Sequence, residues 1–237
     1  MPTLYLLPVT LSDTDPRRVL PSYNLEVAAR LRHFIVENVR TARRFLKKCD
    51  PQADINSMTF YELNGHTPAT QIPSMLEPME RGEDMGVMSE AGCPAIADPG
   101  AQVVAIAQER GYRVEPLVGP SSILLSLMAS GFNGQGFSFH GYLPIETPAR
   151  DKAIRDLEAL SARTGMTQIF IETPYRNNKL LTQLLQTLRP STLLCVARDI
   201  TSPEGEKINT RSIAQWRRAK EELPKVPSIF LIHVPKR

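Results

Sequence analysis

The stretch Ser89-Glu90-Ala91-Gly92-Cys93-Pro94-Ala95-Ile96-Ala97-Asp98-Pro99-Gly100 decides the fold of this chain. It follows the apolar run Met85-Gly86-Val87-Met88 and precedes a helical pattern over residues 101–110. A strand, a Gly/Pro-rich loop and a helix, in this order, are typical of α/β proteins. Their ligands bind outside the carboxyl ends of strands, beside helix N-termini. Plain connections need about two to six residues, so this longer loop is predicted to hold a small molecule.

Short apolar runs alternate with amphipathic segments of helical length along the whole chain, which predicts an α/β fold. In the first half we expect strands at 4–9, 34–37, 59–63, 86–89 and 112–116, and helices at 25–32, 41–49, 72–81 and 101–110. In the second half we expect helices at 121–130, 149–163, 175–188 and 213–221, and strands at 136–142, 167–172, 193–198, 207–210 and 228–234. A boundary near Pro116–Pro120 divides the chain into two α/β domains, residues 1–117 and 118–237.

The composition is that of an ordinary globular protein, with 237 residues, 42% hydrophobic residues and a net charge of +3. No apolar run approaches the roughly 20 residues that span a bilayer, so we expect no membrane association. The N-terminus begins directly as a strand, without the features of a secretory signal. Three cysteines and four scattered histidines show no metal-ligand spacing, which predicts no metal site and a reduced, cytoplasmic setting.

A basic cluster falls on one side of the helix expected at 41–49 and just before it. Arg40, Arg43, Arg44 and Lys47 lie at helical spacing. Two interpretations stay open: a solvated helix face, or a surface that grips phosphates.

Two further segments combine a strand end with a helix start. Val118-Gly119-Pro120-Ser121-Ser122 leads into a helix that serine hydroxyls can cap. In Glu172-Thr173-Pro174-Tyr175-Arg176, Thr173 is expected as a cap and Pro174 at the first helical position. Each segment alone is also explained as a plain helix start. No Gly-x-Gly-x-x-Gly follows the first strand and no P-loop is present, which argues against hydride and phosphoryl transfer.

Taken in order, these segments resemble the tetrapyrrole methylase superfamily of S-adenosylmethionine-dependent methyltransferases. The most similar subgroup is the bacterial small-subunit ribosomal RNA cytidine 2′-O-methyltransferases, whose central motif Ser-Asp-Ala-Gly-Thr-Pro-x-Ile-Ser-Asp-Pro-Gly corresponds to Ser89–Gly100. Further matching segments cover nearly the whole chain: Thr3–Pro8, Glu37–Thr41, Gly119–Ser122, Gly141–Pro144, Phe170–Arg176 and Ala197–Thr201.

The resemblance implies two α/β domains with a cofactor cleft between them, and a homodimer. It implies S-adenosylmethionine as cofactor and ribosomal RNA or the small ribosomal subunit as partner, with ribose 2′-O-methylation as the reaction. Carried over residue by residue, the cofactor contacts are Pro8, Ser89, Glu90, Ala91, Gly92, Cys93, Pro94, Ile96, Asp98, Pro120, Ser121, Ser122, Glu172 and Thr173.

The chain departs from the family pattern mainly near the expected methyl acceptor. The Gly-Asn-Leu-x-Asp after the first strand is replaced by Thr10-Leu11-Ser12-Asp13, and Glu-Asp-Thr-Arg becomes Glu37-Asn38-Val39-Arg40. The general base stays unassigned; the candidate catalytic residues are Glu37, Arg40, Glu90 and Arg176. Two alternatives remain open: methylation of a tetrapyrrole or related small molecule, and cofactor binding without catalysis.

Overall fold

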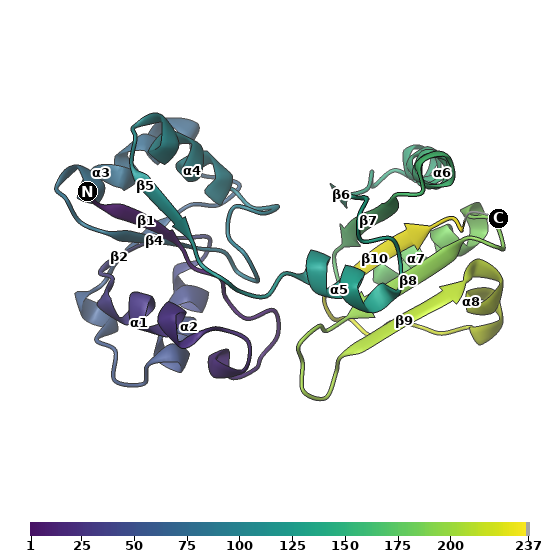
Figure 1. Ribbon diagram of the computed structural model, residues 1–237, viewed down its shortest axis with the longest axis horizontal. Coiled ribbons are helices and arrows are strands. Elements are labelled where there is room, and N and C mark those ends of the chain that lie inside the picture. The colour runs from purple at the N-terminus through teal and green to yellow at the C-terminus, as the bar shows by residue number, and fades with distance from the viewer. Residues whose placement is uncertain (236–237) are drawn as a thin grey trace. The chain divides into compact units, whose positions relative to one another are not determined.

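The computed structural model describes residues 1–235. The chain forms two compact units, one over Met1–Ser121 and one from Ser122 onward (Figure 1). The division falls after residue 121 rather than after the predicted 117. The reason is that the segment after the last strand of the first unit packs within that unit, where Asn24 Nδ2 donates to the Val118 carbonyl at 2.8 Å.

The first unit is built on a parallel sheet of five strands. They are β1 (Thr3–Leu6), β2 (His33–Val36), β3 (Thr59–Glu62), β4 (Met85–Met88) and β5 (Arg113–Pro116). Their order is β3-β2-β4-β1-β5, and every neighbouring pair is parallel. The central strand β4 is buried along its whole length, as expected for a strand with both faces covered.

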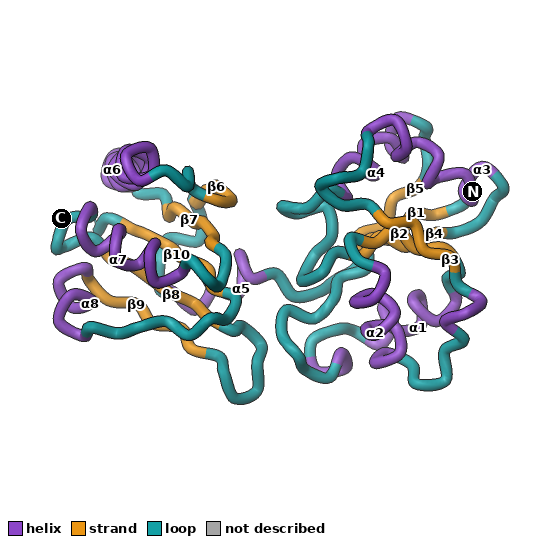
Figure 2. Tube along the Cα trace, turned by 180° about the vertical axis from the view of Figure 1, so that it is seen from behind, coloured by secondary structure: helices purple, strands orange, loops and turns teal. Residues whose placement is uncertain are grey.

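Helices cover both faces of this sheet. The helices α1 (Ser22–Arg30) and α2 (Val39–Cys49) lie on one face, and α3 (Glu77–Glu80) and α4 (Gly100–Glu109) lie on the other (Figures 1 and 2). Two hydrophobic clusters correspond to these faces. Val27 and Leu46 belong to the first, whereas Leu76 and Val103 belong to the second.

The helix predicted at 72–81 is wrong in type. Residues Ala69–Leu76 form a 3-10 helix that contains Pro73, and only the short α3 follows it. Proline lacks the backbone N–H and clashes with the preceding turn of an α-helix, so Pro73 and Pro78 prevent one continuous α-helix here.

The second unit contains a mixed sheet of five strands. They are β6 (Phe137–Tyr142), β7 (Thr167–Glu172), β8 (Leu193–Arg198), β9 (Lys207–Ser212) and β10 (Ser228–His233). Their order is β6-β7-β10-β8-β9. The β6–β7 pair is parallel, and the other three pairs are antiparallel.

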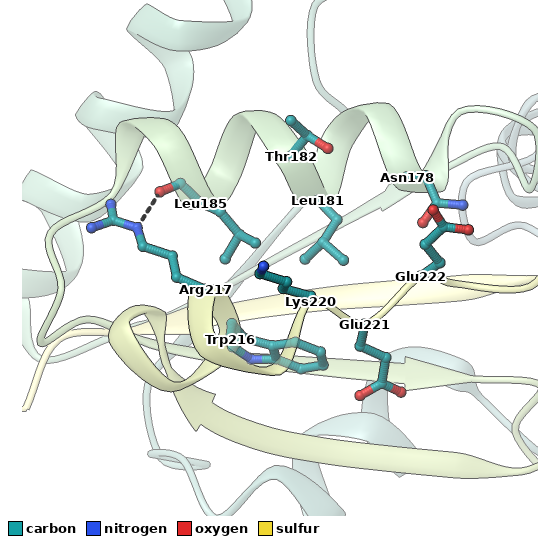
Figure 3. A pocket seen from close by; sticks show the side chains of 9 residues that line it. All are labelled: Asn178, Leu181, Thr182, Leu185, Trp216, Arg217, Lys220, Glu221 and Glu222. Atoms are coloured by element: carbon teal, nitrogen blue, oxygen red, sulfur yellow. Dashed lines mark hydrogen bonds between the residues drawn. The ribbon is translucent and has the colours of Figure 1, made fainter.

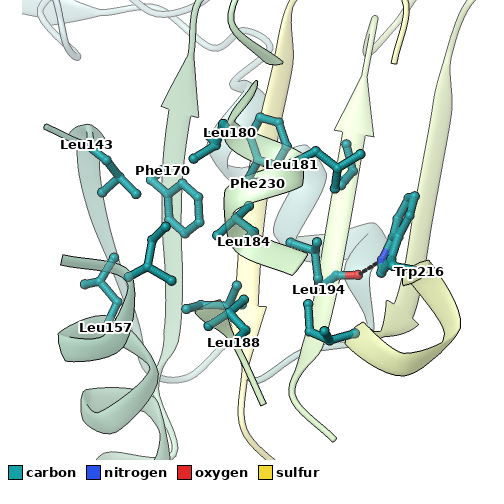
Figure 4. Close-up of a cluster of buried hydrophobic side chains, with 14 of the residues drawn as sticks. Leu143, Leu157, Phe170, Leu180, Leu181, Leu184, Leu188, Leu194, Trp216 and Phe230 are labelled. Carbon is teal, nitrogen blue, oxygen red and sulfur yellow. Dashed lines mark hydrogen bonds between the residues drawn. The ribbon is translucent and has the colours of Figure 1, made fainter. Parts of the chain in front are cut away.

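Three helices, α6 (Thr147–Thr164), α7 (Asn177–Thr187) and α8 (Ile213–Ala219), cover one face of this sheet. Figure 4 shows the resulting core, in which the Trp216 indole donates to the Leu194 carbonyl at 2.9 Å. The helix α5 (Ser122–Ser130) packs on the opposite face, where Thr210 Oγ1 of β9 donates to the Ser130 carbonyl at 2.8 Å. None of the described helices is long and apolar enough to cross a membrane.

The predicted start of α7 is also wrong. Thr173 and Pro174 lie in a turn, and the helix begins at Asn177 with Arg176 at its N-cap. Glu172 accounts for this difference, because its Oε1 accepts a hydrogen bond from the Thr173 N–H at 2.7 Å and pairs with Arg176. These two contacts fix residues 173–176 in a turn, so α7 begins only at Asn177.

Candidate functional site

The strand order of the first unit creates a switch point between β1 and β4. The chain leaves β1 toward β2, and it leaves β4 in the opposite direction toward β5. The helices of these two connections, α1 and α4, lie on opposite faces of the sheet (Figure 2). In parallel α/β sheets, ligands bind in the crevice outside the carboxyl ends of two such strands.

The loops that leave β1 and β4 are joined directly at this point. The Leu7 N–H donates to the Val87 carbonyl, and the Val9 N–H donates to the Gly92 carbonyl, each at 2.9 Å. The second bond makes an isolated antiparallel bridge between the loops. The motif of residues 89–100 is therefore held against the end of β1.

The segment after β5 closes against the same two loops. A Cβ atom on Gly119 would lie 2.2 Å from Pro8 Cβ, so only glycine permits this approach. Cys93 Sγ donates to the Pro120 carbonyl at 3.4 Å. Gly92 has φ +75°, in the left-handed region, and a Cβ there would lie 3.3 Å from the Pro120 carbonyl oxygen. Pro8, Gly92, Cys93 and Pro120, four of the predicted cofactor contacts, thus lie together.

Asp98 organises the second half of the motif. Its Oδ1 accepts hydrogen bonds from the N–H groups of Ala95 at 3.0 Å and Gly100 at 2.7 Å. Ala95 and Ala97 have φ of 67° and 61°, a conformation that is strained for residues other than glycine. Asp98 therefore fixes a strained loop, and such strain clusters at ligand sites.

The other carboxylate oxygen of Asp98 has no partner. Oδ2 is buried and accepts no hydrogen bond from any residue within 1–235. Burial raises the pKa of the Asp98 carboxyl above its ordinary value. A buried acceptor left without a donor is costly, so Oδ2 suits a ligand that supplies a hydroxyl, amine or ammonium group.

Two further acids lie at this edge of the sheet. Glu37 follows β2 and is half-buried. Burial, and then the charge of Asp98, raise the pKa of its carboxyl. Glu90 is exposed and accepts a hydrogen bond from Thr41 Oγ1 at 3.2 Å. Glu37 and Glu90 are predicted catalytic candidates, whereas Thr41 was not among the predicted site residues. Only its place in the matched segment 37–41 could have indicated it.

The remaining motif residues make local contacts. The Ser89 hydroxyl donates to the Ala91 carbonyl at 3.2 Å. Ile96 is a large hydrophobic side chain that is 55% exposed. Burial raises the pKa of the Cys93 thiol, which leaves it a poor nucleophile and agrees with a packing role. Among residues 1–235, no group of three or more His, Cys, Asp or Glu side chains is placed to hold a metal ion.

Glu172, Thr173 and Arg176 lie in the second unit, where the buried Glu172 carboxylate pairs with Arg150 and with the partly exposed Arg176. Glu172 Oε2 lies 3.6 Å from Nη1 of Arg150, which is fully buried. Oε1 lies 2.7 Å from Nη2 of Arg176. Both carboxylate oxygens of Glu172 are therefore engaged within the unit. Its assignment as a cofactor contact stays a prediction, as do those of Thr173 and of Ser122, which opens α5.

A surface pocket between α7 and α8 in the second unit has a different character (Figure 3). The Arg217 side chain donates to the carbonyls of Leu185 and Leu188, and the Trp216 indole N–H is bonded within the core. Glu221 is paired with three cations, including Arg211 at 3.0 Å. Trp216, Arg217 and Glu221 therefore already have partners within this unit, and we assign no ligand to the pocket.

Comparison with known proteins agrees with this arrangement. Residues 25–215 match the family described as Tetrapyrrole (Corrin/Porphyrin) Methylases. Ribosomal RNA small subunit methyltransferase I of Vibrio cholerae is 27% identical over 98% of this chain and 77% of that protein. Proteins of the same name are 29% identical over 88% of this chain in Micromonospora olivasterospora and 34% identical over 59% in Xylella fastidiosa. The alignment spans 63% and 50% of those two proteins, respectively.

Solved structures show the same fold at low identity. The methyltransferase CobJ matches with a TM-score of 0.62 and 15% identity, over 98% of each chain. Uroporphyrin-III-C-methyltransferase from Thermus thermophilus matches with a TM-score of 0.57 and 16% identity, over 100% of this chain and 98% of that one. The family match covers residues 25–215, which is most of the chain, and the solved structures share its fold. This chain therefore belongs to the tetrapyrrole methylase family.

Proposed function

We propose that this chain is an S-adenosylmethionine-dependent methyltransferase that acts on a ribose 2′-hydroxyl of small-subunit ribosomal RNA. Family membership supports methyl transfer, and the names of the relatives support the RNA acceptor. The observation that carries the proposal is the junction of three loops at the switch point, where Gly92 meets Val9 and Pro120. Parallel α/β sheets bind their ligands at such an edge.

The residues at this edge fit the proposed cofactor. S-adenosylmethionine carries hydroxyl, amine and ammonium groups, and Asp98 Oδ2 is a buried acceptor that lacks such a donor among residues 1–235. Gly92 and Gly119 keep the three loops close, so the backbone around Pro8 and Pro120 can hold the ligand. The cleft between two domains and the contacts from Ser122, Glu172 and Thr173 remain part of this proposal.

Bound S-adenosylmethionine supplies a methyl group on a positively charged sulfur. Transfer to a ribose oxygen forms a carbon–oxygen bond, breaks the carbon–sulfur bond and releases the hydroxyl proton. The chain must align the two reactants, exclude water and accept this proton. We assign proton acceptance to the Glu37 carboxylate, because its partial burial and raised pKa make it a stronger base than an ordinary glutamate.

A comparison of ribosomal RNA methylation in wild-type and deletion cells tests the proposal. We expect one 2′-O-methyl mark to disappear and to return with the wild-type chain but not with Gly92→Arg, whose side chain would collide near Leu11 and Pro120. Gly82→Arg serves as the matched control and should restore the mark, because Gly82 also has a positive φ, +86°, but a Cβ there meets nothing within 4 Å. An unchanged map would refute the RNA acceptor.

The alternatives predict other outcomes. A tetrapyrrole methyltransferase would leave the ribosomal RNA map unchanged and would transfer labelled methyl groups to a tetrapyrrole. A cofactor-binding protein without catalysis would bind S-adenosylmethionine in calorimetry and label neither acceptor. We further propose a cytoplasmic homodimer. Sedimentation at several concentrations tests the dimer, and cell fractionation tests the location.

A further inference from the structure

We infer that the exposed basic face of α2, defined by Arg40, Arg43, Arg44 and Lys47, binds the phosphate backbone of the RNA substrate. This inference rests on the proposed function and adds the surface by which the acceptor docks. All four side chains are exposed. Their helical spacing places them along one side of α2, an 11-residue helix of the first unit.

None of these four cations forms an ion pair with an acid among residues 1–235. Among residues 1–235, Arg40 has no side-chain hydrogen bond or ion pair, and Arg44 is attracted to Asp13 only beyond ion-pair distance. Arg43 donates to the Asn56 amide oxygen at 3.0 Å, and Lys47 donates to the Pro51 carbonyl at 3.1 Å. By contrast, the neighbouring Lys48 forms a 2.5 Å ion pair with Asp13.

This arrangement works against the stability of the helix. Arg40 and Arg44, and likewise Arg43 and Lys47, are four residues apart, a spacing at which like charges repel. Arg40 also lies in the first turn, where the helix dipole disfavours a cation. The helix dipole stabilises the positive charges of Lys47 and Lys48 in the last turn, but it does not stabilise those of the three arginines nearer the N-terminus of the helix. An anionic partner would offset these costs.

The geometry around the face suits a polyanion. A surface hollow lies between α2 and residues 53–56 and is lined by the four cations Arg43, Arg44, Lys47 and Lys48. The single acid of its lining, Asp54, accepts a hydrogen bond from the Asn56 N–H at 3.2 Å. The N-terminal end of α2 reaches the candidate site, because Thr41 Oγ1 donates to Glu90 at 3.2 Å. A strand of RNA that follows the helix would therefore lead to the carboxylates at the end of the sheet.

The test uses the double variant Arg44→Gln/Lys47→Gln and small-subunit ribosomal RNA transcribed in vitro. RNA binding is measured by fluorescence anisotropy at several KCl concentrations. Each phosphate contact contributes about 0.7 to the slope of log K against log salt for single strands, so the slope should become shallower by about 1.4. Arg163→Gln/Arg218→Gln removes two exposed cations of the second unit and should leave the slope unchanged.

Other outcomes separate this inference from the proposed function. If the wild-type chain methylates small subunits but the α2 variant keeps the full slope, the docking surface is refuted and the function stands. If the wild-type chain neither methylates nor binds the RNA, both are refuted. Thermal unfolding identifies a misfolded variant; we expect the melting temperature to stay equal or to rise. Binding to phosphatidylserine vesicles is measured for both chains. If the α2 variant loses vesicle binding that the wild-type chain has, but still binds RNA as the wild-type chain does, the basic face binds membranes and the inference is refuted.

Discussion

Thr41 Oγ1 lies 3.2 Å from Glu90 Oε1, and this contact joins the first turn of α2 to the loop after β4. The one hydroxyl hydrogen of Thr41 is shared with the Asn38 carbonyl oxygen, which lies 3.0 Å away. The N-cap residue Asn38 holds the same turn by accepting from the N–H groups of Arg40 and Thr41. The contact places the start of the basic helix beside the loop proposed to hold the methyl donor. It therefore connects acceptor docking with the site of transfer.

The close approach of Gly119 to Pro8 should make Gly119→Ala destabilising. A Cβ would lie 2.2 Å from Pro8 Cβ, and overpacking of this kind costs about 1–3 kcal/mol. Urea unfolding followed by circular dichroism measures the loss, and calorimetry should show weaker S-adenosylmethionine binding. Gly65→Ala is the matched control in the same unit, because a Cβ there meets nothing within 4 Å. Equal behaviour of the two variants would disprove the packing constraint.

The raised pKa of Asp98 predicts a pH-dependent effect of Asp98→Asn. The folded state holds the Asp98 proton to higher pH than the unfolded state, so this group's contribution to stability falls as pH rises from about 4 through the folded pKa. Asparagine does not titrate. The free energy of unfolding of the variant, minus that of the wild-type chain, should therefore increase across this window and then level off. A difference that decreases with pH would contradict burial as the cause.

Glu37→Gln should slow methyl transfer while S-adenosylmethionine binding persists. Loss of a general base costs about 10²- to 10⁴-fold in rate. Single-turnover transfer to small subunits measures the chemical step, and calorimetry measures the binding. In the wild-type chain the rate should rise with pH through the raised pKa of Glu37, and this rise should vanish in the variant. Glu62→Gln, at the end of the edge strand β3, is the control. An unaltered rate in Glu37→Gln would remove Glu37 from the mechanism.

Glu172→Ala should strongly destabilise the second unit. It leaves the fully buried Arg150 without its carboxylate, and breaking a buried ion pair costs about 3–5 kcal/mol. The single tryptophan of the chain, Trp216, lies in this unit, so its fluorescence reports the unfolding directly. Asp156→Ala breaks an exposed pair with Lys152 and should change little. A small effect of Glu172→Ala would show that the network contributes little stability.

Local sequence patterns predicted most elements because their signals are local. The strand at 193–198 was predicted with its observed bounds, and β7 was likewise predicted over 167–172. The predictions were wrong where a nonlocal or competing effect dominated, as at Pro73 within the expected helix and at Glu172, whose turn displaces the start of α7. Strand order depends on packing between distant segments, so the Val9–Gly92 bridge could not be read from the sequence.

The candidate site was predictable in part for the same reason. The motif at 89–100 is contiguous, so the sequence alone was enough to predict its residues as part of the site. The partners of its side chains are distant in sequence: Cys93 contacts Pro120, and Glu90 contacts Thr41. The unpartnered Oδ2 of Asp98 depends on the burial of the folded loop, which no sequence pattern encodes.

The transfer of labelled methyl groups tests the central claim most directly. Purified chain is incubated with S-adenosylmethionine that carries a radioactive methyl group and with small ribosomal subunits from deletion cells. The account predicts label in the ribosomal RNA, at a ribose 2′-oxygen, with the wild-type chain and none with Gly92→Arg. Absence of label from the RNA with the wild-type chain, while the chain binds S-adenosylmethionine, would contradict it.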